Sequence, residues 1–193
     1  MGIVFQYPET QLFEQTVYDD IAFGPKNIGL DNIEERVKQA AGFVGISEEL
    51  LKRSPFELSG GEQRRAAIAG VIAMKPEILV LDEPTVGLDP AAKRDILNKI
   101  KEYHQTSRNT VIMVTHDIDT AAEFADKILV LDNGRLIKYG TCDEIFGVGA
   151  DLASALPEMT KIFRELGRRG FDVSPNIYTL EQAKREILIE LGM

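Results

Sequence analysis

The sequence of 193 residues has a single cysteine, Cys142, and no tryptophan. One cysteine cannot form an internal disulfide or a cysteine-rich zinc site, and this scarcity is typical of a reducing cytoplasm. The longest apolar run, residues 66–74, is too short to cross a bilayer, which takes about 20 residues. The first residues show no basic stretch followed by an apolar one, so they do not have the pattern of a signal peptide. We therefore expect a cytoplasmic protein that reaches a membrane only through a partner.

Positive charge is also scarce. The chain has 22 Lys and Arg against 31 Asp and Glu, a formal net charge of −9. Nucleic-acid phosphates would repel such a chain, so we expect no nucleic-acid partner. Hydrophobic residues make up 44% and charged residues 27%, which is ordinary for a folded protein and argues against disorder.

Short apolar runs in the centre of the sequence predict a parallel sheet. Residues 78–81, 110–114 and 127–131 are continuous apolar runs, the pattern of strands buried on both faces. Residues 2–5 have the pattern of a strand already in progress. After the last central run, the dipeptide at 133–134, Asn-Gly, predicts a tight turn into an antiparallel strand.

Helices are predicted between these runs from their capping signals. The three helices, each with its capping residues, are Gly60–Met74 (a Ser59 and Glu62 capping box), Pro90 to about His104 (Asp89) and 118–124 (Asp117). Alternating strands and helices predict an α/β fold class, with a parallel sheet and helices on its faces.

Both flanks of this centre are predicted to be helical. Residues 16–57 are mostly helical, with Asp31 and Glu34 as the cap of the middle helix. The C-terminal flank carries two amphipathic helices, Pro157–Arg169 and Leu180–Leu191.

We place a domain boundary near residue 148, so that residues 1–147 form the main domain and 148–193 a helical extension. The apolar faces of the two C-terminal helices predict a dimer surface; the alternative is that they fold back onto the chain's own core. The residues concerned are Met159, Ile162, Phe163, Leu166, Ile187, Leu188 and Leu191.

Polar residues follow three of the predicted strands. Asp82 and Glu83 come directly after one strand, His116 follows the next, and Gln6 follows the first. The carboxyl ends of parallel strands meet at one sheet edge, where open α/β folds place their ligands. There Asp82 suits a magnesium ion, Glu83 can accept a proton from water, and His116 can donate a hydrogen bond to a phosphate. Gln6 can orient a water or ligate magnesium. The alternative is a set of solvated acids, a structural histidine and a surface amide.

Two glycines open the helix that follows Ser59. Gly60 and Gly61 let backbone N–H groups approach an anion closely, and the helix dipole and the Ser59 hydroxyl add to the attraction for phosphate. Glu62 is acidic and is expected to turn back and cap the helix. The simpler interpretation is a helix cap with a flexible entry.

Taken in order, these segments resemble the ATP-binding-cassette (ABC) ATPase family over residues 3 to about 140. The matching segments are 5–6 (Q-loop), 58–63 (signature), 79–85 (Walker B), 87–89 (D-loop) and 115–117 (switch histidine). The resemblance implies a P-loop NTPase-like fold with a helical signature subdomain, ATP and Mg²⁺ as cofactors, and two subunits that sandwich each nucleotide. The residues to which it assigns roles are Glu83, His116 and Gln6 in hydrolysis, Asp82 and Gln6 at magnesium, and Ser59, Gly60, Gly61 and Asp89 at the nucleotide.

A narrower resemblance rests on residues 5–25, which are similar to the ATPase subunits of energy-coupling-factor transporters, uptake systems for vitamins and for cobalt or nickel. The tail after Pro157 is similar to the C-terminal helical domain that pairs their ATPases. The implied partners are a second ATPase subunit, identical or paralogous, a transmembrane coupling subunit and a substrate-binding membrane subunit. The implied location is the cytoplasmic face of the cell membrane. The acidic segment 9–35 is then expected to contact basic coupling helices.

One family motif is missing from the sequence. No Gly-x-x-x-x-Gly-Lys-Ser/Thr occurs in the 193 residues, although this P-loop holds the β- and γ-phosphates in the family. We therefore expect that the chain has lost an N-terminal part and does not bind ATP well alone. The alternative is a non-catalytic subunit that donates its signature to a complete ATPase.

Overall fold

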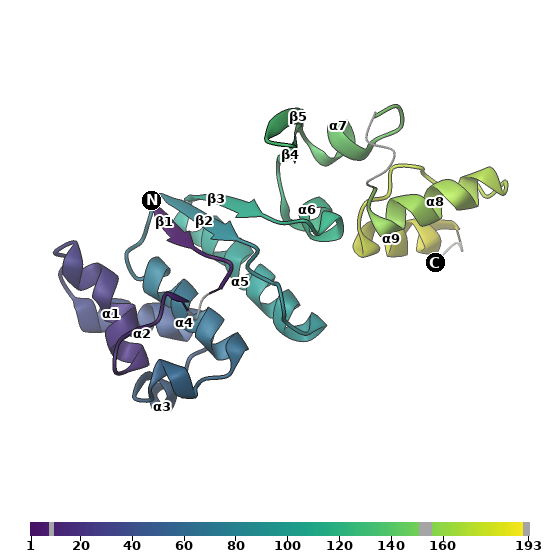
Figure 1. The fold of residues 1–193 in the computed structure, drawn as a ribbon. Helices are drawn as coiled ribbons and strands as arrows, with labels where there is room; N and C mark the ends of the chain where they lie inside the picture. Colours follow the sequence, from purple (N-terminus) through teal and green to yellow (C-terminus); the bar gives the residue numbers. More distant parts are fainter. Residues whose placement is uncertain (8–9, 151–155, 191–193) are drawn as a thin grey trace. The chain divides into compact units, whose positions relative to one another are not determined.

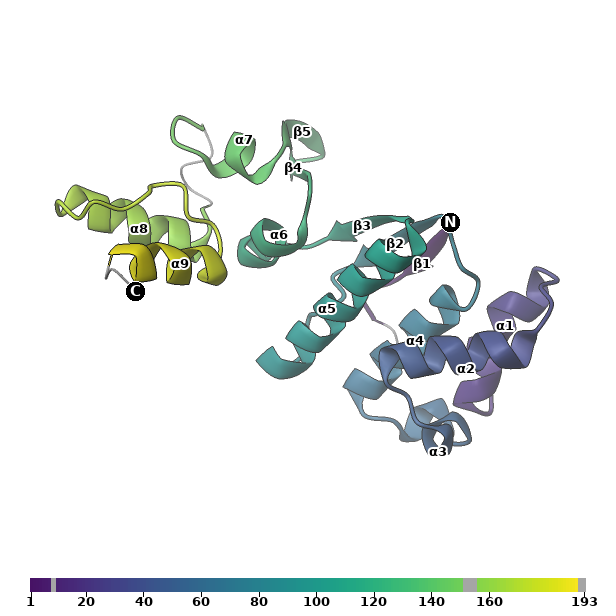
Figure 2. The same ribbon diagram turned by 180° about the vertical axis from the view of Figure 1, so that it is seen from behind.

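The computed structural model describes residues 1–7, 10–150 and 156–190. They form two compact units, Met1–Val114 and Thr115–Met193, and Figures 1 and 2 show the elements of each from opposite sides. The boundary predicted at residue 148 lies inside the second unit. In the part of the chain that the structure describes, no helix is both long enough and apolar enough to span a bilayer.

A three-stranded parallel sheet forms the centre of the first unit. Its strands β1 (Gly2–Val4), β2 (Ile78–Asp82) and β3 (Thr110–Val114) lie in that order. The pairing is parallel on both sides of β2. This confirms the parallel sheet for three of the four predicted runs.

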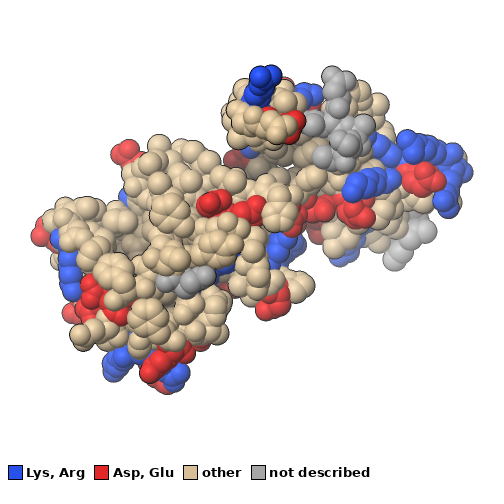
Figure 3. All heavy atoms as spheres, viewed as in Figure 1, with Lys and Arg blue, Asp and Glu red and all other residues tan. Residues whose placement is uncertain are grey.

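One face of this sheet is covered by α4 (Gly60–Ile72) and α5 (Pro90–Ser107). In Figure 2, α5 lies in front of the strands. The buried side chains on the covered face are Val4, Leu79 and Leu81. On the other face, Ile112 and Val114 are 49% and 52% exposed, and uncharged side chains predominate on the side of this unit seen in Figure 3. The prediction of burial on both faces is therefore wrong, because strand residues alternate between faces and helices on one side bury every second residue.

The run at 127–131 does not join the parallel sheet. It forms β4 (Ile128–Asp132), which pairs antiparallel with β5 (Arg135–Gly140) in the second unit. The predicted turn is present, with positive φ at both Asn133 and Gly134. The tight turn lets β4 pair with its immediate neighbour, whereas a parallel partner needs a long crossover. The expected parallel fourth strand is thus corrected to a hairpin.

The segment 16–57 is helical, as predicted. Its elements are α1 (Val17–Asn27), α2 (Ile33–Val44), α3 (Glu48–Leu51) and the short 3₁₀ helix η2 (Pro55–Glu57). Both α1 and α2 pack against α4, and Val17, Ile21 and Val37 are fully buried there. This packing joins the helical part to the sheet in one hydrophobic core.

The cap of α2 differs from the prediction. Asn32 is the N-cap, in a left-handed conformation with φ 58°, and it makes no side-chain capping bond. Asparagine tolerates this conformation better than most residues. Glu34 pairs with Lys38 one turn later (2.7 Å) and does not take part in a cap with Asp31.

The second unit holds α6 (Ile118–Phe124), α7 (Cys142–Phe146), α8 (Glu158–Arg168) and α9 (Leu180–Glu190) besides the hairpin. Tyr178 lies in the core around Ile145 and donates a hydrogen bond from its hydroxyl to Asp143 (2.5 Å). Burial and this carboxylate raise the pKa of Tyr178. Residues on both sides of position 148 therefore share a core.

The C-terminal helices split their apolar residues between a local core and the surface. Phe163 is 2% exposed and packs with Ile177 and Ala183, so its predicted place on a dimer surface is wrong. Ile162 and Ile187 are 45% and 47% exposed. Leu191, assigned to the same surface, lies outside the described residues.

Candidate functional site at the carboxyl edge of the sheet

The structure brings Gln6, Asp82 and Glu83 to the carboxyl edge of the parallel sheet (Figure 1). Val4 ends β1 opposite Leu81 of β2, so Gln6 follows one strand end while the two acids follow its neighbour. All three side chains are partly exposed. The edge therefore presents two carboxylates and an amide to solvent, as the sequence predicts for these residues.

The backbone at Glu83 is fixed in an uncommon conformation. Glu83 has φ +46°, and its N–H donates to the carbonyl of Val114 (2.9 Å) while its own carbonyl accepts from Val86 (3.3 Å). A positive φ at a non-glycine residue costs about 1–3 kcal/mol and is found disproportionately at functional sites. The strand end is thus held in a strained turn that sets the direction in which Glu83 leaves the sheet.

A buried arginine, Arg64 of α4, ties this edge together, and sequence reasoning missed it. It is 8% exposed. Its Nη1 donates to the carbonyls of Pro84 (3.0 Å) and Val86 (2.6 Å), and its Nη2 donates to the carbonyl of Gln6 (3.2 Å). A buried guanidinium is stable only when its donors are paired in this way. No signal in the sequence distinguishes it from Arg65, since both arginines precede the apolar run 66–74.

Arg64 couples three segments that are far apart in the sequence. It lies on the helix that begins with Ser59, and it binds both the loop after β2 and the residue after β1. The position of the glycine-rich helix start is thereby linked to the position of the acid pair. A shift of one segment must break hydrogen bonds to the others.

The start of α4 confirms the predicted capping box. The Ser59 hydroxyl accepts from the N–H of Glu62 (3.4 Å), and the Glu62 carboxylate accepts from the Ser59 N–H (2.8 Å) and hydroxyl (2.7 Å). These bonds from Ser59 hold the pKa of Glu62 below its ordinary value. The space around Gly60 is open, since a Cβ built there meets no heavy atom within 4 Å. This helix end can therefore receive a ligand or a second protein.

Two further predicted residues are Asp89 and His116. Asp89 is exposed and caps α5, accepting from the N–H groups of Ala91 (2.9 Å) and Ala92 (3.0 Å). His116 is exposed and belongs to the second unit. Glu83 belongs to the first unit, so the role of His116 beside it stays a prediction.

The loop after Gln6 is anchored by a buried acid, Asp20 of α1. Its Oδ1 accepts from the N–H groups of Phe13 (3.0 Å) and Glu14 (3.2 Å), and its Oδ2 is buried without a partner among the described residues. Burial is the main cause that raises the pKa of Asp20, partly offset by the two N–H groups. The charged form is therefore disfavoured in the folded state.

We expect Asp20→Asn to unfold at equal or higher urea concentration than the parent at pH 7, with a difference that shrinks towards pH 4. A carboxyl group whose pKa is higher in the folded than in the unfolded state stabilises the fold at pH values below its unfolded-state pKa. This contribution is lost as the pH rises through the folded-state pKa. The amide keeps the Oδ1 acceptor and removes the charge. Asp20→Ala, which leaves two N–H groups without their acceptor, should lose about 1–3 kcal/mol. Asp31→Asn, at an exposed position, is the control; a parent more stable than Asp20→Asn at pH 7 and at pH 4 contradicts the argument.

Sequence comparison places the chain among ATP-driven transport proteins. A profile of the ABC transporter family matches residues 1–86. The chain is 51% identical over 193 residues to the energy-coupling factor transporter ATP-binding protein EcfA2 of Caldanaerobacter subterraneus, covering 97% of this chain and 68% of that protein. It is 47% identical to EcfA2 of Bacillus subtilis, covering 97% of this chain and 70% of the relative. The chain thus spans about two thirds of these relatives.

Solved structures agree with the sequence matches. CbiO1 from Clostridium perfringens, described as part of the ABC transporter complex CbiONQ, superposes with a TM-score of 0.71 at 35% identity, over 98% of this chain and 66% of that one. The ATP-binding cassette MJ0796, in a dimeric post-hydrolysis state with ADP and Pi, superposes with a TM-score of 0.65 at 27% identity, over 72% of this chain and 62% of that one. Both likenesses identify the fold as that of ABC ATPases.

Proposed function

Because the chain belongs to the ABC transporter ATPases, and among them to the energy-coupling factor ATP-binding proteins, we propose that it is part of a subunit that couples ATP hydrolysis to import of a vitamin or metal ion. The observation that carries this proposal is the 51% identity to the energy-coupling factor transporter ATP-binding protein EcfA2, and the Arg64 network shows that the matching segments are joined in one site. Arg64 bonds the backbone of Gln6 and of the turn after Glu83 to α4. The first turn of α4 has open space around Gly60, which a second subunit can approach.

The roles at the sheet edge follow from the residue types. Glu83 accepts a proton from the attacking water, and His116 donates a hydrogen bond to the terminal phosphate. Asp82 and Gln6 supply oxygen ligands, the type that Mg²⁺ takes in proteins. Among the described residues no group of three His, Cys, Asp or Glu could enclose a metal. Mg²⁺ at nucleotide sites is commonly held by one or two carboxylates together with phosphate oxygens. When bound, the ion offsets the negative charge of the phosphates.

The open helix start is proposed to bind the nucleotide of the opposite subunit. The N–H groups at Gly60 and Gly61 carry the partial positive charge of the helix start, which suits a phosphate. The Ser59 hydroxyl donates to Glu62 and is proposed to turn to the phosphate when the nucleotide binds. Glu62 is occupied by the capping box, so its charge is directed to the helix rather than to the ligand. Asp89, exposed at the next loop, is proposed to contact the second subunit.

A second candidate function rests on the missing P-loop. Without that motif in the 193 residues, the chain lacks the family's cradle for the β- and γ-phosphates. A non-catalytic subunit could still donate Ser59, Gly60 and Gly61 to the nucleotide of a complete ATPase. The two candidates differ in whether this chain's own Glu83 faces a bound nucleotide.

The experiment that separates them measures phosphate release. The 193-residue chain alone is expected to release phosphate from MgATP at background rate, because the removal of even one preorganised charge stabiliser costs about 10²–10³ in rate. A fusion that places the P-loop segment of the Caldanaerobacter relative before Met1 should restore turnover. Restored turnover supports the catalytic candidate. A fusion that binds ATP but remains inactive supports the signature donor, and turnover by the chain alone contradicts both.

The membrane partner is proposed to contact the segment that carries α1. Phe13 and Phe23 stack edge to face (4.8 Å between ring centroids) yet are 58% and 39% exposed. Exposed aromatic pairs are typical of protein–protein contacts, and the acidic segment 9–35 complements a basic coupling helix. We propose a transmembrane coupling subunit as this partner, a separate membrane subunit for substrate, and a peripheral location at the cytoplasmic face of the cell membrane.

The C-terminal helices are proposed to pair two ATPase subunits, identical or paralogous. The large apolar residues that stay exposed on α8 and α9 are Ile162 (45%), Leu180 (72%), Ile187 (47%) and Ile189 (70%). Burial of such side chains between two subunits contributes about 25 cal/mol per Å².

We expect Ile187→Glu to abolish self-association of the chain in analytical ultracentrifugation. A charge at a buried subunit contact must be desolvated without a partner. Leu136→Glu, at a 59% exposed position on β5, is the matched control and should associate like the parent. Equal association of Ile187→Glu and the parent rejects α9 as the pairing element.

A further inference from the structure

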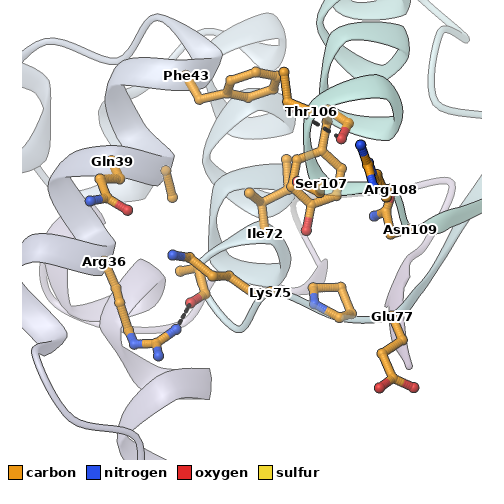
Figure 4. Close-up of a pocket in the computed structure, with 14 residues that line it drawn as sticks. Arg36, Gln39, Phe43, Ile72, Lys75, Glu77, Thr106, Ser107, Arg108 and Asn109 are labelled. Carbon is orange, nitrogen blue, oxygen red and sulfur yellow. Dashed lines mark hydrogen bonds between the residues drawn. The ribbon is translucent and has the colours of Figure 1, made fainter.

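A cavity of about 500 Å³ lies in the first unit, away from the site described above. It is lined by α2, by the C-terminal ends of α4 and α5, and by the residues that lead into β2 and β3 (Figure 4). Because these strands are parallel, the residues before them lie at the opposite edge of the sheet from Asp82 and Glu83. Its volume is within the range of small-molecule pockets, about 300–1,000 Å³.

Three basic side chains line this cavity: Arg36, Lys75 and Arg108. Arg36 is held in place by hydrogen bonds to two backbone carbonyls (2.9 and 3.3 Å). The side chains of Lys75 and Arg108 make no hydrogen bond or ion pair with another described residue. The one acid of the lining, Glu77, points away from the other labelled side chains in Figure 4. In a chain of net charge −9, this is a local excess of positive charge that attracts an anion.

The lining also contains buried polar atoms that lack partners. Asn109 is 7% exposed, and neither its Oδ1 nor its Nδ2 makes a hydrogen bond to any described residue. The hydroxyl of Tyr103, a residue 5% exposed, lies beside the side chains of Asn109 and Ser107, which partly offset the rise in its pKa that burial causes. The carbonyl of Asn109 contacts Nδ1 of His104 (2.6 Å), so the backbone that carries the free amide is anchored. These side-chain atoms have almost no accessible surface, so they form a fixed part of the cavity wall.

The remaining walls are apolar. Phe43, Ile72 and Pro76 line the cavity together with the ring of Tyr103. A few polar groups that converge on an otherwise apolar cavity are the usual composition of a small-molecule site. An inorganic ion would contact the cations and leave the apolar walls uncovered.

We propose that this cavity binds a small organic anion, a molecule with a phosphate or carboxylate group on an aromatic or short apolar body. The anionic group is placed against Arg108, where charge-assisted hydrogen bonds form. The apolar body packs against Phe43. The site goes beyond the proposed ATPase function. It joins α2 to the end of α5, so an occupant stabilises the packing of these helices.

The test uses the ¹⁵N-labelled 193-residue chain and four probes: phenyl phosphate, benzoate, inorganic phosphate and phenol. We expect phenyl phosphate, benzoate or both to shift the amide signals of the cavity residues in a saturable way, with at least tenfold tighter binding than inorganic phosphate or phenol. The phenyl phosphate and benzoate arms separate a phosphate site from a carboxylate site. Arg108→Asn should weaken binding of the preferred probe about tenfold, the loss of one charge-assisted hydrogen bond. Asparagine suits the φ of +51° at this position.

Lys52→Asn, which removes an exposed lysine outside the cavity, is the charge-matched control and should leave binding unchanged. The proposal is overturned by any of four results: no saturable shifts, shifts outside the cavity, inorganic phosphate or phenol binding as tightly as the organic anions, or equal loss in Lys52→Asn. Because the readout is binding and not ATP hydrolysis, failure here leaves the proposed function standing.

Discussion

Glu83→Gln is expected to lower steady-state ATP hydrolysis by about 10²–10⁴-fold in the fusion that carries a P-loop segment. A glutamine cannot accept the proton of the attacking water, and a positioned general base contributes about that factor. The amide has nearly the same shape, so the strained turn at φ +46° and the Arg64 network should persist. The variant should therefore retain ATP and accumulate as a dimer. Gel filtration with MgATP and a phosphate-release assay measure the two effects.

The matched control is Glu77→Gln, an acid just before the other end of the same strand, which should hydrolyse ATP like the parent. Ser59→Arg provides the opposite phenotype. A long side chain at the open start of α4 should block the second subunit, so neither a dimer nor turnover is expected. Parental turnover in Glu83→Gln would mean that Glu83 is not the base and that the mechanism proposed for this strand end is wrong.

Arg64→Ala is expected to lower the free energy of unfolding by about 3–5 kcal/mol, the largest loss of any single substitution considered for this fold. The change leaves the carbonyls of Gln6, Pro84 and Val86 without their donor in a buried site. Breaking one side of a buried charged network costs about this much. Urea unfolding of the chain measures the loss.

Arg65→Ala is the control for that experiment because it removes an arginine from the next position of the same helix. The Nε of Arg65 is buried and makes no hydrogen bond to a described residue, so its removal leaves no acceptor without a donor. The free energy of unfolding should fall by at most about 1 kcal/mol, mostly because packing is lost. Arg64→Lys keeps the charge but not the planar set of donors. Its loss of unfolding free energy should lie between those of Arg64→Ala and Arg65→Ala. Equal losses of unfolding free energy in Arg64→Ala and Arg65→Ala would mean that Arg64 does not stabilise the sheet edge.

Local signals in the sequence determined much of this structure. The capping box at Ser59, the cap and proline at Asp89 and the turn at Asn133 all predicted elements that the structure contains. These features depend on hydrogen bonds and φ preferences within a few residues, and such preferences are encoded in residue type. The order of the motifs also sufficed to identify the family, since it involves residue types at fixed spacing.

Tertiary structure alone decided which strands pair, which faces are covered and which charges are buried. The apolar run at β4 looks the same as those of β2 and β3, but pairing with β5 depends on competition between a near and a distant partner. Nothing local marks Arg64 as the residue that binds three carbonyls, because its partners come from segments 20 to 58 residues away. The cavity at Asn109 likewise exists only where α2, α4 and α5 converge. Sequence patterns report local preference, whereas burial and long-range hydrogen bonds arise when distant segments pack together.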